Sequence, residues 1–70
     1  MTQHITIHLN GKPVEALQGQ TIAQLLEKQG ADPAHVVVEV NRNIINRDAY
    51  GSTTISRDDV IEVLRFVGGG

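Results

Sequence analysis

Three consecutive glycines, Gly68, Gly69 and Gly70, have the clearest capacity for chemistry in this sequence. They follow a strand-like run over residues 60–67 and place a carboxylate at the end of the sequence. Glycine lacks a Cβ atom, so a glycine segment obstructs least when another surface closes around it. Three extended residues reach roughly 10 Å. We therefore expect Gly68 and Gly69 to thread into the active site of another protein, where Gly70 presents its carboxylate.

The remaining side chains offer little competing chemistry. Cysteine is absent, which excludes a disulfide, a thiolate nucleophile and a cysteine-ligated metal. His4 and His8 would share one face of a strand but lie roughly 13 Å apart, too far to chelate one ion. Asp58 and Asp59 fall in a predicted turn, where aspartate is favoured for local backbone hydrogen bonds. We expect no metal site, no bound cofactor and no enzymatic activity of the chain's own.

The size and charge of the sequence exclude several classes of function. Seventy residues make one small domain, which buries only about 60% of its unfolded surface and leaves little room for a deep active site. The formal net charge is −2 and the basic residues are scattered, whereas nucleic-acid binding needs a clustered cationic surface. No apolar run is long enough for a membrane span, and residues 1–4 do not open a signal peptide. We expect a cytoplasmic protein that is monomeric on its own.

The first part of the sequence predicts a β-hairpin. Residues 5–9 alternate between apolar and polar side chains, which is typical of a strand with one buried face. Asn10 and Gly11 follow, and this dipeptide is the strongest short hairpin signal because both turn positions need a positive φ. Residues 14–16 continue the alternation on the returning strand.

A single helix is predicted next, over residues 22–29. Thr21 and Gln24 have the spacing of a capping box, in which each side chain bonds the backbone of the other residue. The apolar residues of the segment form one stripe on the helix surface. Gly30 is a suitable C-terminal cap, and Pro33 prevents the helix from continuing.

The second half predicts short strands joined by turns. These are a strand over 35–40, a turn at 41–43, a short strand at 44–45, one 3₁₀ turn within 46–51, a short edge strand at 53–55 and the last strand over 60–67. The last strand is the longest and the most apolar, so we expect it in the centre of the sheet.

This order of elements predicts an α+β fold of the β-grasp, or ubiquitin-like, class. The sheet is expected to be mixed, with four to five strands and one main helix across one face. We place the β-grasp domain at residues 1–67 and a flexible glycine tail at residues 68–70.

Several of these segments resemble the ThiS family, the sulfur carriers of thiamin biosynthesis. The resemblance lies in residues 36–45, in Arg47 and in residues 59–70, and it spans nearly the whole chain. It implies that a ThiF-like enzyme adenylates the carboxylate of Gly70 with ATP. It also implies conversion to a thiocarboxylate (1-thioglycine at Gly70), with sulfur from a cysteine desulfurase or another donor. A ThiG-like thiazole synthase would then receive the sulfur.

Two loop positions depart from the family pattern. The family often has proline at the position of Asn46 and glycine at the position of Asp58. Both departures leave the tail itself unchanged.

The last strand also carries candidate partner-binding residues. Ile61 and Val63 alternate with Leu64 and Phe66, so both faces of this strand are apolar. One set faces the helix, and the other is either covered by a loop or exposed to bind a partner. We predict that Leu64 and Phe66, together with Arg65 between them, bind partner proteins.

Three other functions stay open at the level of sequence. A ubiquitin-like modifier would join its terminal glycine to lysines of target proteins. A sulfur carrier could serve another pathway, such as molybdopterin synthesis or tRNA thiolation, although the molybdopterin carriers usually have a proline near the glycines that residues 65–67 lack. A plain interaction module would have an idle tail.

Overall fold

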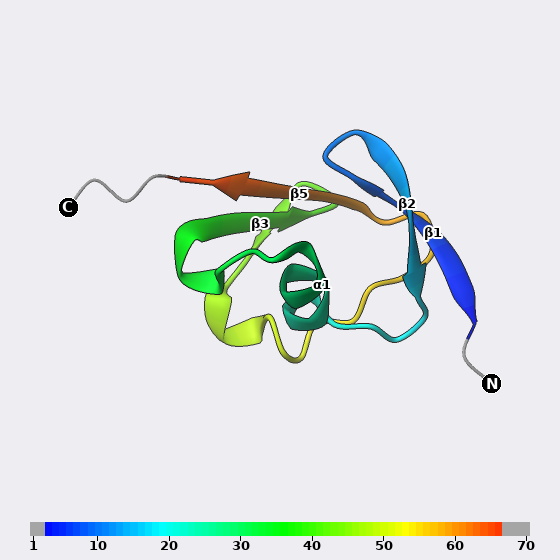
Figure 1. The fold of residues 1–70 in the computed structure, drawn as a ribbon, viewed down its shortest axis with the longest axis horizontal. Coiled ribbons are helices and arrows are strands. Elements are labelled where there is room, and N and C mark those ends of the chain that lie inside the picture. Colours follow the sequence, from blue (N-terminus) through cyan, green and yellow to red (C-terminus); the bar gives the residue numbers. More distant parts are fainter. Residues whose placement is uncertain (1–2, 67–70) are drawn as a thin grey trace.

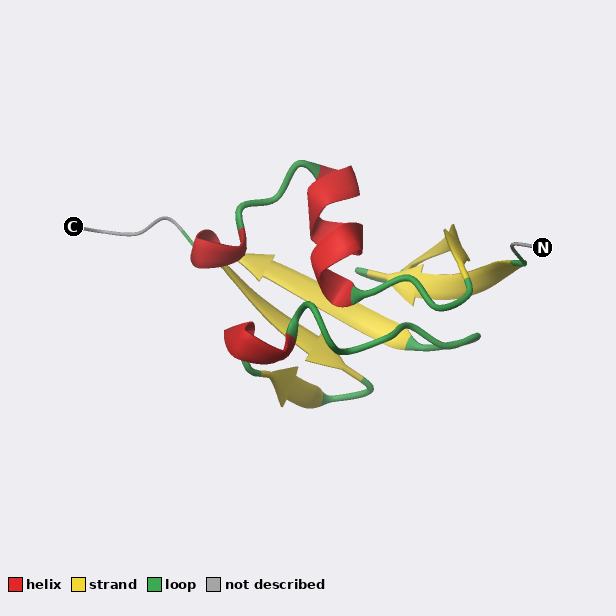
Figure 2. Cartoon of the chain, turned by 90° about the horizontal axis from the view of Figure 1, so that it is seen from below, coloured by secondary structure: helices red, strands yellow, loops and turns green. Residues whose placement is uncertain are grey.

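The computed structural model describes residues 3–66 of the chain. Its elements are β1 (His4–Leu9), β2 (Lys12–Leu17), α1 (Ile22–Gln29), the 3₁₀ turn η1 (Pro33–His35), β3 (Val36–Val40), β4 (Asn43–Ile45), the 3₁₀ turn η2 (Arg47–Ala49) and β5 (Val60–Arg65). The strands form one mixed sheet in the order β2-β1-β5-β3-β4. In Figures 1 and 2, α1 lies on one side of this sheet. The predicted β-grasp architecture is therefore confirmed.

The last strand in the sequence, β5, occupies the middle of the sheet, as predicted. It pairs in parallel with β1 through His8↔Val60 and Leu9↔Ile61. On its other side it pairs antiparallel with β3, from Val40↔Ile61 to Val36↔Arg65. Pairing with β1 is thus confined to the start of β5, and the strand continues beyond β1 alongside β3 (Figure 1).

The hydrophobic core lies between the sheet and α1. Alternate residues of β1 point into it, and the helix contributes one apolar stripe. The fully buried large side chains are Ile7, Ile22, Leu25, Leu26, Val38, Ile55 and Ile61. Each such side chain contributes about 1.5–3 kcal/mol relative to an exposed position. In a domain with no cysteine, this packing is the main source of stability.

The helix begins and ends where local chemistry predicts. The Thr21 hydroxyl accepts a hydrogen bond from the Gln24 amide at 3.2 Å, and the Gln24 side-chain oxygen accepts one from the Thr21 amide at 2.9 Å. This capping box satisfies two backbone donors at the N-terminus. Gly30 adopts a left-handed conformation with φ of 70° and ends the helix.

Two tight turns use residues with positive φ. Asn10 and Gly11 connect β1 to β2 with φ of 50° and 81°, as the hairpin prediction requires. Asn41 and Arg42 connect β3 to β4 with φ of 51° and 73°. Positive φ at both central residues matches the twist of the flanking strands. Arg42 has a Cβ atom, so this conformation costs roughly 1–2 kcal/mol that a glycine would avoid.

Asp58 also has a positive φ, of 67°, in the turn that precedes β5. This is the position at which the sequence departs from a glycine common in similar sequences. Aspartate tolerates the left-handed region better than most residues. Asp59 stabilises the same turn, because its carboxylate accepts bonds from the Ser56 amide at 2.8 Å and the Asn41 side-chain amide at 3.0 Å. The turn interpretation of this acidic pair is confirmed.

Several elements or bounds predicted from the sequence were wrong. β5 ends at Arg65, so Phe66 lies outside the last strand, in which it had been predicted, and β4 begins at Asn43, which had been predicted in the turn. Residues 53–55 form no edge strand, and only an isolated bridge joins Thr54 to Thr21. The segment lies beside the residues that lead into α1, where the Ile55 amide donates to the Gln20 carbonyl at 2.7 Å and the Thr53 carbonyl accepts from the Ile22 amide at 3.0 Å. His35 ends η1 and lies before β3, because Asp32 caps that turn through the Ala34 amide.

Other predictions fall outside the described residues. The domain boundary at 67 and the flexible tail at 68–70 belong to this group. Within residues 3–66, no helix is long and apolar enough to cross a bilayer.

Side chains of two turn asparagines extend the pairing of β5. The Asn10 side chain accepts a hydrogen bond from the Val63 amide at 2.8 Å and donates one to the Val63 carbonyl at 3.4 Å. It thereby continues the β1 side of the ladder after β1 has ended. The Asn41 side chain accepts from the Val60 amide at 2.9 Å. These contacts hold β5 straight along the sheet.

We predict that Asn10→Ala lowers the free energy of unfolding by about 1.5–3.5 kcal/mol. Loss of the hydrogen bonds to Val63 accounts for about 0.5–1.5 kcal/mol, and alanine at positive φ adds about 1–2 kcal/mol. Asn10→Gly is the matched control, since it loses only the hydrogen bonds. Chemical denaturation measures both variants, and equal stability of Asn10→Ala and the wild type would contradict the role of this side chain.

Candidate functional site

The candidate site lies where β5 ends and the chain continues toward the glycines. The Phe66 amide donates to the His35 carbonyl at 3.1 Å, one residue beyond the end of β5. The backbone is therefore anchored to its neighbour up to Phe66. Gly68, Gly69 and Gly70 lie outside the described residues, so their predicted roles stay predictions.

An aromatic contact reinforces this anchor. The rings of His35 and Phe66 meet edge to face, with centroids 6.4 Å apart and an interplanar angle of 78°. His35 Nδ1 also lies 3.1 Å from Asp32 Oδ2, so the ring is oriented from both sides. The antiparallel register of β3 on β5, continued by one residue beyond Val36↔Arg65, places His35 opposite Phe66.

The two faces of β5 differ sharply in burial. Ile61 is fully buried and Val63 half-buried on the helix side, whereas Leu64 and Phe66 are 53% and 44% exposed on the other side. Of the two alternatives that the sequence left open, exposure is confirmed, and no loop within residues 3–66 covers this face. Leu64 stands directly opposite Val37 of β3.

Neighbouring strands extend this exposed surface. Ile44 on β4 is 71% exposed and stands opposite Glu39 of β3, on the same face of the sheet as Val37. We call the residues Val37, Ile44, Leu64 and Phe66 the apolar strip. Contiguous apolar side chains on the surface of a small protein often mark a binding site for another protein.

A hollow of about 390 Å³ borders the apolar strip near the end of β5. Its walls come from β3, β4, η2 and the residue after β5. The lining residues are Val36, Val37, Ile44, Ile45, Asn46, Arg47, Tyr50 and Phe66. The hollow has room for an apolar side chain of a partner protein. Arg47 is exposed beside it and can attract an acidic group of the same partner. These residues come from separate parts of the chain, so no local sequence pattern groups them.

Arg65 does not share a face with the other two predicted partner-binding residues. It pairs with Val36, whose side chain is buried on the helix side of the sheet. Arg65 lines a different hollow, together with Gln29 and Ala31 at the end of α1. The structure thus brings Leu64 and Phe66 together and separates Arg65 from them. Its role in partner binding stays a prediction.

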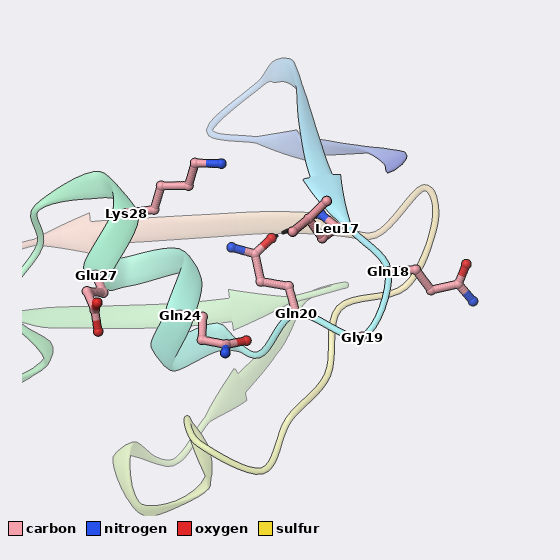
Figure 3. Close-up of a pocket in the computed structure, with 7 residues that line it drawn as sticks. All are labelled: Leu17, Gln18, Gly19, Gln20, Gln24, Glu27 and Lys28. Atoms are coloured by element: carbon pink, nitrogen blue, oxygen red, sulfur yellow. Dashed lines mark hydrogen bonds between the residues drawn. The ribbon is translucent and has the colours of Figure 1, made fainter. Parts of the chain in front are cut away.

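A larger hollow lies elsewhere on the described chain (Figure 3). It has a volume of about 520 Å³ and lies between α1 and the loop after β2. Its lining residues are Leu17, Gln18, Gly19, Gln20, Gln24, Glu27 and Lys28. The Gln20 side chain is already used, because it accepts a bond from the Leu17 amide at 3.1 Å. In Figure 1 this loop lies toward the other end of the molecule from the end of β5.

Comparison with known proteins shows a consistent relationship. Residues 7–70 match the model of the ThiS family. The chain is 38% identical over 65 residues to the sulfur carrier protein ThiS of Bacillus subtilis. The aligned segment covers 91% of this chain and 98% of that protein. A thiazole synthase of Magnetococcus marinus is 45% identical over 64 residues, and the chain spans 20% of that relative's length. The crystal structure of the thiamine biosynthesis protein ThiS from Geobacter metallireducens has a TM-score of 0.79 at 33% identity, with 94% of this chain and 100% of that chain covered.

The burial pattern of β5 predicts opposite outcomes for truncations on its two faces. Leu64→Ala is expected to lower the free energy of unfolding by less than about 1 kcal/mol, because the side chain is half in solvent. Ile61→Ala removes a fully buried side chain and is expected to lower it by about 2–5 kcal/mol. Thermal and chemical unfolding measure both. A loss of stability in Leu64→Ala as large as that in Ile61→Ala would place Leu64 in the core.

Proposed function

Because the chain belongs to the ThiS family, we propose that it carries sulfur for thiamin biosynthesis on the carboxylate of Gly70. The observation that carries this proposal is the family match itself, which runs through the three glycines to residue 70. In this role the chain is a protein cosubstrate and leaves catalysis to its partners. Without cysteine, a terminal carboxylate is the group on which it can hold sulfur as an acyl species.

The proposed chemistry begins with activation of a poor electrophile. A carboxylate oxygen of Gly70 attacks the α-phosphorus of ATP in the active site of a ThiF-like partner, and pyrophosphate leaves. The acyl adenylate then has a good leaving group. A sulfur nucleophile attacks the acyl carbon and AMP leaves. A sulfide-level donor gives the thiocarboxylate directly. A persulfide on a cysteine desulfurase gives an acyl disulfide, and a thiol then cleaves its S–S bond, which releases the thiocarboxylate and leaves a disulfide on the thiol side. The proposed product is a thiocarboxylate, 1-thioglycine, at Gly70.

The fold supports this role by setting the reach of the tail. Backbone pairing anchors the chain up to Phe66, and the four residues beyond it span at most about 14 Å when extended. Reacting atoms must come within about 3–3.5 Å of each other in a productive complex. The partner therefore has to bind the sheet close to the end of β5, where Leu64 and Phe66 are exposed.

A thiazole synthase is the proposed acceptor of the sulfur. Two relatives of this chain, from Magnetococcus marinus and Paramagnetospirillum magneticum, are named thiazole synthase. They are about five times longer than the matched segment, with 20% and 19% of their length covered. That a matching segment occurs within thiazole synthases supports a ThiG-like partner for this chain.

We predict that chain length at the terminus decides whether activation occurs. Removal of Gly70 leaves a glycine carboxylate that is roughly 3.5 Å short, and a misplacement of 1 Å can already lower a rate about a hundredfold. One residue added after Gly70 places the terminal carboxylate beyond the position next to ATP in the active site of the partner. Both variants are expected to yield no adenylate or thiocarboxylate, as measured by intact mass after incubation with ATP, the ThiF-like enzyme and a sulfur donor.

The wild-type chain is the positive control, and its terminus is expected to exchange oxygen for sulfur. Unfolding curves of both variants should match the wild type, since the core lies within residues 3–66. Wild-type yields from either variant would rule out a mechanism specific to the terminus. Isopeptide conjugates to lysines of other proteins, in place of a thiocarboxylate, would indicate a ubiquitin-like modifier.

We also predict that Leu64→Ala and Phe66→Ala weaken binding to the adenylating enzyme by about 1–4 kcal/mol each, the usual range for apolar anchors. Isothermal calorimetry measures the dissociation constant. Gln18→Ala, in the loop after β2, is the matched control and should bind like the wild type. Unchanged affinity of both variants, with their folds intact, would remove the apolar strip from the interface.

A further inference from the structure

Two glutamates stand directly opposite each other on the open face of the sheet. Glu39 of β3 pairs in register with Glu62 of β5. Residues opposite each other in an antiparallel pair have Cβ atoms about 4.5–5.5 Å apart, and like charges at such positions destabilise a sheet. A neutral or oppositely charged residue at either position would remove this repulsion.

Within the described residues, neither of the two carboxylates has a salt-bridge partner. Between residues 3 and 66 the one salt bridge joins His35 of η1 to Asp32, which precedes that turn. Other acidic side chains bond locally, as Asp32 does with the Ala34 amide and Asp59 with the Ser56 amide. Within the same residues, no hydrogen bond involves the side chain of Glu39 or Glu62.

Apolar side chains surround this acidic pair. Ile44 stands opposite Glu39 on one side, and Val37 and Leu64 form the next cross-strand pair toward the end of β5. The acidic pair and the apolar strip are therefore parts of one continuous face. A partner that covers Leu64 and Ile44 must also remove water from around the two carboxylates.

We propose that this face binds a surface of the adenylating enzyme that combines apolar groups with an arginine or lysine placed between Glu39 and Glu62. The inference rests on the proposed function, because it names the surface that the activating partner presents. Two glutamates whose Cβ atoms lie about 4.5–5.5 Å apart can direct both carboxylates to one guanidinium, whose planar fork of donors can bond both. Exclusion of water by the surrounding apolar contacts strengthens this charge interaction. The repulsion within the free chain then becomes attraction for a cation in the complex.

The test measures affinity and stability on the same variants. Glu39→Gln/Glu62→Gln removes both charges and keeps the side-chain shapes. Glu15→Gln/Glu27→Gln is the matched control, with an equal change in net charge at exposed positions on β2 and α1. Dissociation constants for the ThiF-like enzyme are measured by calorimetry at two salt concentrations, and midpoints of thermal unfolding are measured for the free chains.

We expect the dissociation constant of Glu39→Gln/Glu62→Gln to rise about tenfold or more, with a weaker dependence on salt than the wild type. Its unfolding midpoint should equal or exceed that of the wild type, since a repulsion is lost. The control pair should bind like the wild type. Glu62→Lys should be stabilised by an ion pair with Glu39 and should bind more weakly still.

Affinity and salt dependence equal to the wild type in Glu39→Gln/Glu62→Gln would overturn this inference. An equal loss of affinity in Glu15→Gln/Glu27→Gln would also overturn it, because the weaker binding would then follow from the change in net charge alone. Failure of the wild-type chain to be adenylated would instead overturn the proposed function, and this inference with it. If the wild type is adenylated but Glu39→Gln/Glu62→Gln binds like the wild type, only the inference about the two glutamates fails and the proposed function stands.

Discussion

The position of β5 between β1 and β3 is the constraint on which the rest of the structure depends. A strand in the middle of a sheet needs backbone partners on both sides and an apolar face toward the core. β5 has both over its first half, through β1 and β3. Over its second half β1 has ended, and the Asn10 side chain takes over the bond to the Val63 amide. The last strand can thus run past the end of β1 and still have a hydrogen-bond partner on that side at Val63.

The small core explains why function falls on the surface and at the end of the chain. The buried residues form one cluster between the sheet and α1, and a domain of this size has little volume to spare for an internal site. One helix covers one face of the sheet, which leaves the other face to solvent. A protein built in this way can act by presenting a surface and a terminus to larger enzymes. The apolar strip and the glycines would supply these two parts.

Several features of the described chain lower its stability, and they lie near the surfaces assigned to function. Glu39 and Glu62 place like charges at opposite positions of neighbouring strands, and Ile44 and Leu64 expose large apolar side chains. Local choices that oppose stability are expected where a sequence also has to bind a partner. Arg42, with its positive φ, is a different case, because it lies in a turn and nothing in the structure connects it with binding.

The sequence by itself determined the local elements and their order, because these depend on neighbouring residues. Asn10 and Gly11 make a hairpin turn, Thr21 and Gln24 start the helix, and Gly30 ends it, each through contacts within a few positions. The length and apolar content of the run over residues 60–67 also identified the central strand.

Tertiary structure alone decided which distant residues meet. The register of β3 on β5 places Phe66 beside His35 and Glu62 beside Glu39, and a shift of one residue would have broken both contacts. It also separated Arg65 from Leu64 and tied residues 53–55 to the loop before α1, since long-range hydrogen bonds, unlike turn chemistry, leave no local pattern in the sequence.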